Sequence, residues 1–100
     1  MNFGDRITDE TILKRIAEND PMAMKRKNFR RGGIKGYFIN EIHELDGQYY
    51  LRQVYHDGHL EDPSIYLLRS KKEARKIFKA REGKVIVPFP MEDLSICSFF

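Results

Sequence analysis

The amino-acid sequence predicts a single α+β domain with N-terminal helices, a three-stranded antiparallel meander, a capped amphipathic helix and a short C-terminal strand. Two patterns predict it: aromatic and β-branched residues punctuated by Asp-Gly pairs, and a helix-capping pattern that begins at Ser70. A chain of 100 residues that is 41% hydrophobic supports one core. We divide it into a helical basic part (1–33), a β-meander (34–69), a helix (70–83), and a C-terminal strand with an apolar tail (84–100).

The N-terminal part is expected to hold two helices. Thr8 or Asp9 can cap a first helix that runs to about Asn19, with isoleucine and leucine on one stripe. The pair Asp20-Pro21 ends it and can open a second, strongly basic helix that stops at Gly32-Gly33. A disordered basic arm over this second stretch is the alternative.

The middle of the chain is expected to form three strands joined by tight turns. Segments 37–43 and 48–55 flank Asp46-Gly47, which is a hairpin signal, and a second Asp-Gly at 57 and 58 leads to a third strand at 64–68. Apolar residues of these strands and of the following helix are predicted to form the core: Phe38, Ile42, Leu51, Ile65, Leu67, Ile77 and Phe78.

The segment from Ser70 to Gly83 predicts an amphipathic helix. Ser70 and Glu73 have the spacing of a capping box, and Gly83 stands where a left-handed residue can end a helix. Apolar residues fall on one stripe of this helix, and five cations share the other side. A solvated helix face is the commonplace explanation of such a pattern, but its charges are nearly all of one sign.

The C-terminal part is expected to form a short strand over 84–89, followed by an apolar stretch ending at Phe99-Phe100. That end either packs on the domain or docks on a second copy, which would give a homodimer. Cys97 is the single cysteine, so an intramolecular disulfide is impossible and a reducing cytoplasm is the expected location. The sequence shows neither a leader pattern nor an apolar run near the ~20 residues that cross a bilayer, so we expect no membrane partner.

Positive charge is concentrated in two separate stretches. Residues 25–35 carry six bases and no acid, and residues 69–84 carry eight bases and two acids, whereas residues 36–68 carry one base and six acids. Two basic faces suit a phosphate backbone or an acidic protein partner. The candidate binding residues are cations of these stretches: Lys71, Lys72, Arg75, Lys76, Lys79, Arg26, Arg30 and Arg31.

We expect neither a metal nor a cofactor nor a catalytic residue. The cluster of His56, His59, Glu61 and Asp62 lacks a zinc-shell spacing, and the sequence has no nucleophile elbow or phosphate loop. A metal-independent ribonuclease is the one enzyme class that composition leaves open, since it needs no linear motif. Its candidate residues are Arg52, Tyr55, His56 and His59.

Two binding functions follow from these patterns. The first is a small nucleic-acid-binding module, for DNA or RNA, in which the helix cations grip the phosphate backbone and affinity falls with salt. The second is a non-enzymatic interaction or inhibitor protein, of the kind phages encode, that meets an acidic protein. Five tyrosines beside the bases could also stack nucleobases, although tyrosines on strands more often pack against their cross-strand neighbours.

The run from Ser70 to Arg75, SKKEAR, resembles the start of the second helix in double-stranded RNA-binding domains, whose Ser-Lys-Lys-x-Ala-Lys pattern sets two lysines across phosphates. The resemblance implies that Lys71, Lys72 and Arg75 contact phosphates. It covers about six residues of the chain, and the Gly-Pro-x-His loop of that family is missing from the first hairpin. A three-stranded sheet with one helix is also similar to the arm-type DNA-binding domains of tyrosine recombinases.

Overall fold

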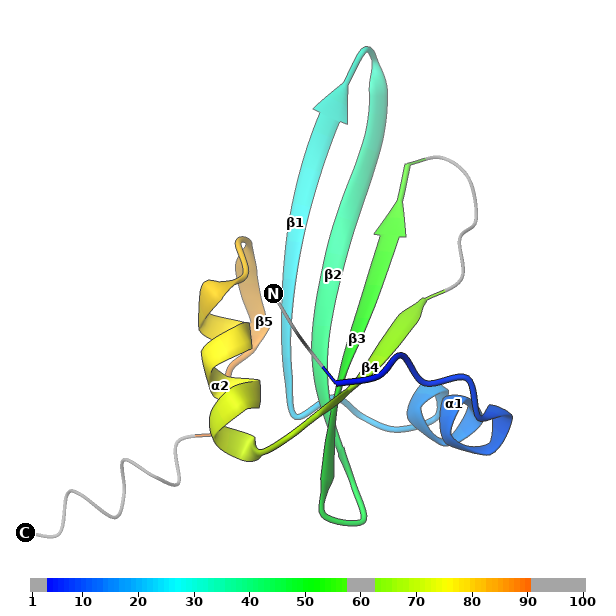
Figure 1. The fold of residues 1–100 in the computed structure, drawn as a ribbon. Coiled ribbons are helices and arrows are strands. Elements are labelled where there is room, and N and C mark those ends of the chain that lie inside the picture. The colour runs from blue at the N-terminus through cyan, green and yellow to red at the C-terminus, as the bar shows by residue number, and fades with distance from the viewer. Residues whose placement is uncertain (1–3, 58–62, 91–100) are drawn as a thin grey trace, which may run out of the picture.

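The computed structural model describes residues 4–57 and 63–90, which form one antiparallel sheet with a helix on each face (Figure 1). In chain order the elements are α1 (Glu10–Ala17), β1 (Ala23–Arg31), β2 (Ile34–Leu45), β3 (Gln48–His56), β4 (Ser64–Leu68), α2 (Lys71–Ala80) and β5 (Lys84–Val87). The strands lie in the order β4-β3-β2-β1-β5. Helix α2 therefore links one edge of the sheet to the other, and the α+β class is confirmed.

The strand register assigns each side chain to a face of the sheet. Ala23 pairs with Ile42, Ile42 with Leu51, and Leu51 with Tyr66, so these residues share one face. Helix α2 covers that face, which we call the α2 face. Helix α1 packs on the opposite one, the α1 face, where Ile16 contacts Tyr50 and Ile65.

The predicted second helix is wrong, because that segment is strand β1. Gly32 and Gly33 have φ values of +58° and +84°, the backbone of a two-residue turn that reverses the chain into β2. Lys25 supplies a tertiary reason for the extended form, since its ammonium donates to the carbonyl oxygens of Phe78 and Arg81 at 2.7 and 3.0 Å. The chain thus has one N-terminal helix in the described residues and a sheet of five strands instead of a three-stranded meander.

The other predicted elements are present. The three strands expected in the middle of the chain are β2, β3 and β4, and Asp46-Gly47 is the turn between the first two, with φ values of +51° and +80°. The first helix has Asp9 as its N-cap, whose carboxylate accepts from the amide of Thr11 at 2.8 Å. The C-terminal strand is β5, and it pairs with β1.

Helix α2 begins where the capping pattern places it. The Ser70 hydroxyl accepts from the amide of Glu73 at 3.1 Å, but the Glu73 carboxylate accepts from the amide of Arg69, at 2.9 Å, and not from that of Ser70. The Arg69 guanidinium holds the carboxylate there and lowers the pKa of Glu73. The helix ends at Ala80, ahead of the predicted stop at Gly83, which instead leads into β5.

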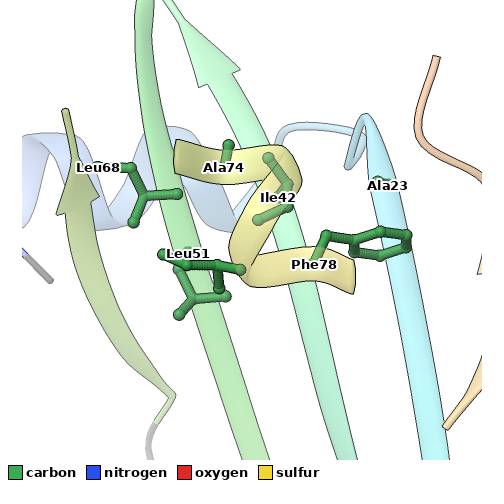
Figure 2. Close-up of a cluster of buried hydrophobic side chains, with 7 residues drawn as sticks. Ala23, Ile42, Leu51, Leu68, Ala74 and Phe78 are labelled. Atoms are coloured by element: carbon green, nitrogen blue, oxygen red, sulfur yellow. The ribbon is translucent and has the colours of Figure 1, made fainter. Parts of the chain in front are cut away.

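The main core lies between α2 and the sheet (Figure 2). Ala74, Ile77 and Phe78 of α2 pack against side chains from four strands: Ala23, Ile42, Leu51 and Leu68 supply one each. Of the predicted core residues, Ile42, Leu51, Ile65, Ile77 and Phe78 are buried and Leu67 is partly buried. Phe38 is 37% exposed, so its assignment to the core is wrong.

Some expectations concern residues outside the described part of the chain. Gly58 of the second Asp-Gly pair, His59 and the apolar C-terminal tail lie there, and so does Cys97. Within residues 4–57 and 63–90, no helix is both long enough and apolar enough to cross a membrane.

Candidate nucleic-acid interface

The β1–β2 hairpin extends beyond its neighbours as a two-stranded ribbon (Figure 1). Strand β5 pairs with β1 only from Met24 to Arg26, and β3 pairs with β2 only as far as Tyr37. Residues 27–36, here named the basic ribbon, therefore have no further strand beside them in the described sheet. The ribbon carries Lys27, Arg30, Arg31 and Lys35 and contains no carboxylate.

Two cations of the ribbon lie directly opposite each other. Arg30 pairs with Lys35 in the β1–β2 register, so both side chains point to the α1 face. Like charges at facing positions destabilise a strand pair. No salt bridge compensates either residue within the described residues, and both are exposed. An anion bound between them would remove this repulsion.

A hollow of about 660 Å³ lies at the same place and is here named the basic hollow. The Arg26 guanidinium lies over the Tyr37 ring at 4.3 Å, and Tyr37 stacks on His56 with centroids 5.1 Å apart and planes 8° from parallel. Stacking and a hydrogen bond to Asn28 hold Arg26 in position. No carboxylate lines the basic hollow. Its lining residues are Arg26, Asn28, Phe29, Arg30, Lys35, Gly36, Tyr37 and His56.

Three aromatic rings from β1, β2 and β3, here named the aromatic cluster, lie together on the α2 face of the sheet. Phe29 stacks on Tyr55 at 5.6 Å with planes 9° apart, and Phe38 lies 5.1 Å from Phe29 and 4.9 Å from Tyr55. The Phe29 ring fits because its strand partner is Gly36, where a Cβ would lie 2.3 Å from the ring. Arg31 lies over Phe29 at 5.9 Å, so a cation flanks the aromatic cluster.

The helix cations form a second group. Lys72, Lys76 and Lys79 are exposed and make no salt bridge with a described residue, whereas Arg75 lies over the Phe89 ring at 5.3 Å and Lys71 is half-buried. The C-terminal end of α2 is fastened to the base of the hairpin by Lys25 and by the ion pair of Lys27 with Glu82.

The eight predicted binding residues thus lie on two elements. Five are on α2, and Arg26, Arg30 and Arg31 are on β1. Because side chains alternate along a strand, Arg31 lies on the α2 face, and Arg26 and Arg30 lie on the α1 face. The structure therefore brings Arg31 to the same side of the sheet as the helix cations and separates Arg26 and Arg30 from them.

Several of the acidic residues that the structure describes are engaged away from the ribbon. Asp46 pairs with Arg15 at 2.7 Å, and the guanidinium lowers the pKa of that carboxyl. Glu41 is buried and receives hydrogen bonds from His43 Nε2 at 2.7 Å and Arg52 at 3.0 Å. Among the described carboxylates, only Glu82 forms a salt bridge with a ribbon cation, Lys27. The positive field of the ribbon is therefore largely uncompensated among the described residues.

The buried network around Glu41 links the strands to the end of α1. His43 accepts from the Asn19 amide at its Nδ1, at 3.1 Å, which fits an imidazole with its proton on Nε2. Burial alone would raise the pKa of Glu41, but the hydrogen bond from His43 and the charge of Arg52 outweigh it and lower that pKa. His43 is only 1% exposed, so it offers no surface to a ligand.

The ribonuclease candidates do not converge. Tyr55 and His56 are successive residues of β3 and point to opposite faces, and Arg52 is bound to Glu41. His59 lies outside the described residues. Among the residues that the structure describes, no group of three or more His, Cys, Asp or Glu side chains is placed to hold a metal ion.

Sequence reasoning missed the aromatic cluster and the basic hollow. The neighbours of Phe29, Tyr37 and Lys35 follow from the β1–β2 register. A prediction of β1 as a helix does not include that register. Gly32-Gly33 between two segments is a recognised hairpin signal and could have revealed it.

Comparisons with protein-family models, curated protein sequences and solved structures gave no match for this chain. The five-stranded sheet with two helices also differs from the three-stranded sheet with one helix on which the similarity to arm-type DNA-binding domains of tyrosine recombinases was based.

Proposed function

We propose that this protein binds nucleic acid and that the basic ribbon is its main point of contact with the phosphate backbone. The observation that carries the proposal is the ribbon itself: it projects from the sheet, has four cations and no carboxylate, and sets Arg30 opposite Lys35. A phosphate between these two residues would turn their repulsion into two charge-assisted hydrogen bonds. The exposed lysines of α2 extend the contact.

The dimensions of the ribbon suit this role. A two-stranded β-ribbon is narrow enough to enter the major groove of duplex DNA, and it can equally lie along a single strand. Arg26 is held by Tyr37, so less side-chain entropy is lost when it binds a phosphate. As expected from the sequence, the proposed location is the cytoplasm.

The test compares two lysines that differ only in position. Lys35→Gln removes a ribbon charge, and Lys14→Gln removes an exposed charge from α1, which lies away from the tip of the hairpin (Figure 1). Affinity for a fluorescent oligonucleotide is measured by anisotropy at several salt concentrations. We expect the Lys35 variant to bind more weakly and to lower the slope of log K against log salt by about 0.7 to 0.9. The Lys14 variant should match the wild type.

Two results would contradict the proposal. One is wild-type protein that binds no oligonucleotide at low salt, and the other is identical affinity and slope for the Lys35 and Lys14 variants. Far-UV circular dichroism of both variants controls for unfolding.

A second candidate function is an interaction protein with an acidic partner. The edge strand β5 favours it, because Val85 and Ile86 are 45% and 50% exposed and an edge strand can pair with an added one. A pull-down from nuclease-treated extract separates the two candidates: a retained protein supports this one, and loss of all bound material supports nucleic acid.

A further inference from the structure

A second hollow, of about 580 Å³, opens on the α2 face between the aromatic cluster and the C-terminal end of α2. We name it the helix-end hollow. Its floor is the part of the sheet that α2 leaves uncovered, where Lys27 pairs with Phe38 and Phe38 with Tyr55, and where Asn40 pairs with Gln53 and Gln53 with Ser64. Its rim is formed by residues 80–82.

The lining combines flat apolar surface with hydrogen-bonding edges. Phe38 and Tyr55 contribute two rings, and Phe38 is 37% exposed although it is a large apolar residue. The Gln53 amide donates to the Asn40 carbonyl oxygen at 3.2 Å, which leaves the Gln53 carbonyl oxygen and one amide hydrogen for another partner. Ring faces beside donor and acceptor groups are what a nucleobase requires.

We propose that the helix-end hollow binds an unpaired base of a single-stranded nucleic acid, which would stack on Phe38 and Tyr55 and present its polar edge to Gln53. This inference rests on the proposed function and adds the form of nucleic acid to it. A volume of about 580 Å³ is ample for one base. A base within a duplex must first be unstacked and unpaired, at a cost of a few kcal/mol, to enter a hollow, whereas an unpaired strand pays no unpairing cost and is the occupant that we propose.

The charges around the hollow agree with this occupant. Lys27 and Arg81 line it together with Glu82, so cations outnumber the carboxylate. The aromatic cluster continues from Phe38 and Tyr55 to Phe29, and Arg31 lies over Phe29. A base in the hollow would thus leave the adjoining backbone next to the ribbon cations, and one strand could use both.

The experiment separates base contacts from backbone contacts. Anisotropy titrations compare a single-stranded DNA oligonucleotide with an abasic strand of the same length, which keeps every phosphate and lacks every base. We expect the wild type to bind the base-bearing strand about tenfold more tightly, because one base stacked on aromatic side chains gives about 5- to 150-fold. Phe38→Leu keeps the apolar volume but removes the ring, and should reduce this ratio toward one while leaving abasic affinity unchanged.

Val85→Ala is the control, because Val85 is a 45% exposed apolar residue of β5 that lies outside both the hollow and the basic ribbon. Its ratio should equal that of the wild type. The inference would be overturned if the wild type bound the two strands equally, or if Phe38→Leu left the ratio of the two affinities unchanged. In either case, salt-dependent binding would still support the proposed function. No binding of either strand would overturn both. Equal affinities with a dimer that Phe38→Leu dissociates would assign the hollow to a second copy of the chain.

Discussion

Strand β2 runs through two regions of opposite character. At its C-terminal end Glu41, Ile42 and His43 are buried between the two helices, and the polar groups among them are paired with Arg52 and Asn19. At its N-terminal end Ile34 and Lys35 are exposed, and the only strand that pairs with them in the described sheet is β1. The comparison shows that one end of the strand is packed and internally paired, whereas the other end leaves Arg30 and Lys35 exposed without a salt bridge to a described residue.

The largest contrast is expected for apolar truncation in the two regions. Leu51→Ala opens a cavity in a fully buried site under α2 and should lower the free energy of unfolding by about 2–5 kcal/mol. Ile34→Ala, in the ribbon, should change it by no more than about 0.5 kcal/mol. Urea denaturation followed by circular dichroism measures both. Similar losses for the two variants would show that the ribbon is as tightly packed as the core.

An intermediate effect is expected for Glu41→Gln. Since the pKa of Glu41 is lowered in the folded state, its stabilising contribution is complete above the unfolded value of about 4.3 and is lost as pH falls through the folded value. The free energy of unfolding of the variant should therefore be about 1–3 kcal/mol below that of the wild type at pH 7, and the difference should decrease toward pH 3.

Glu44→Gln is the control for that titration, because Glu44 lies on the same strand but is exposed. Urea unfolding of the three proteins at a series of pH values provides the measurement. A deficit of the Glu41 variant that stays constant down to pH 3 would contradict the assigned direction of the pKa.

The smallest effect has the opposite sign. Arg30→Gln removes one of two facing cations from the ribbon and should raise the free energy of unfolding by about 0.2–1 kcal/mol, while it weakens oligonucleotide binding. Differential scanning calorimetry at low salt measures this gain in stability. The gain should shrink at high salt, because salt screens the repulsion between the two cations in the wild type. A destabilised variant would mean that Arg30 makes a favourable contact within the fold.

Local signals predicted the elements that carry complete patterns. Ser70 caps α2, Asp46-Gly47 turns β2 into β3, and the apolar stripe of α2 is the buried one. In each case the residues that determine the structure are close in sequence. An apolar residue on a strand is buried where a helix covers it, and the sequence does not show how much of the sheet α2 covers. Phe38 lies in the uncovered part, so its assignment to the core was wrong.

Strand β1 could not be recognised from its own residues. Alternation between apolar and polar residues arises when one face of a strand is buried, but both faces of the ribbon meet solvent, so its sequence lacks that period. The predicted cations of α2 and β1 are exposed or partly exposed, and their division between two faces depends on the register with β2. The aromatic cluster draws Phe29, Phe38 and Tyr55 from three strands and has no local signature.

The short length of β5 has a consequence for self-association. Beyond Arg26 the outer edge of β1 has no described strand beside it, so its backbone groups could pair with the same edge of another molecule. Lys27, Arg30 and Arg31 lie along that edge, and their mutual repulsion opposes such pairing. Each charge removed from the ribbon therefore also weakens a safeguard against aggregation.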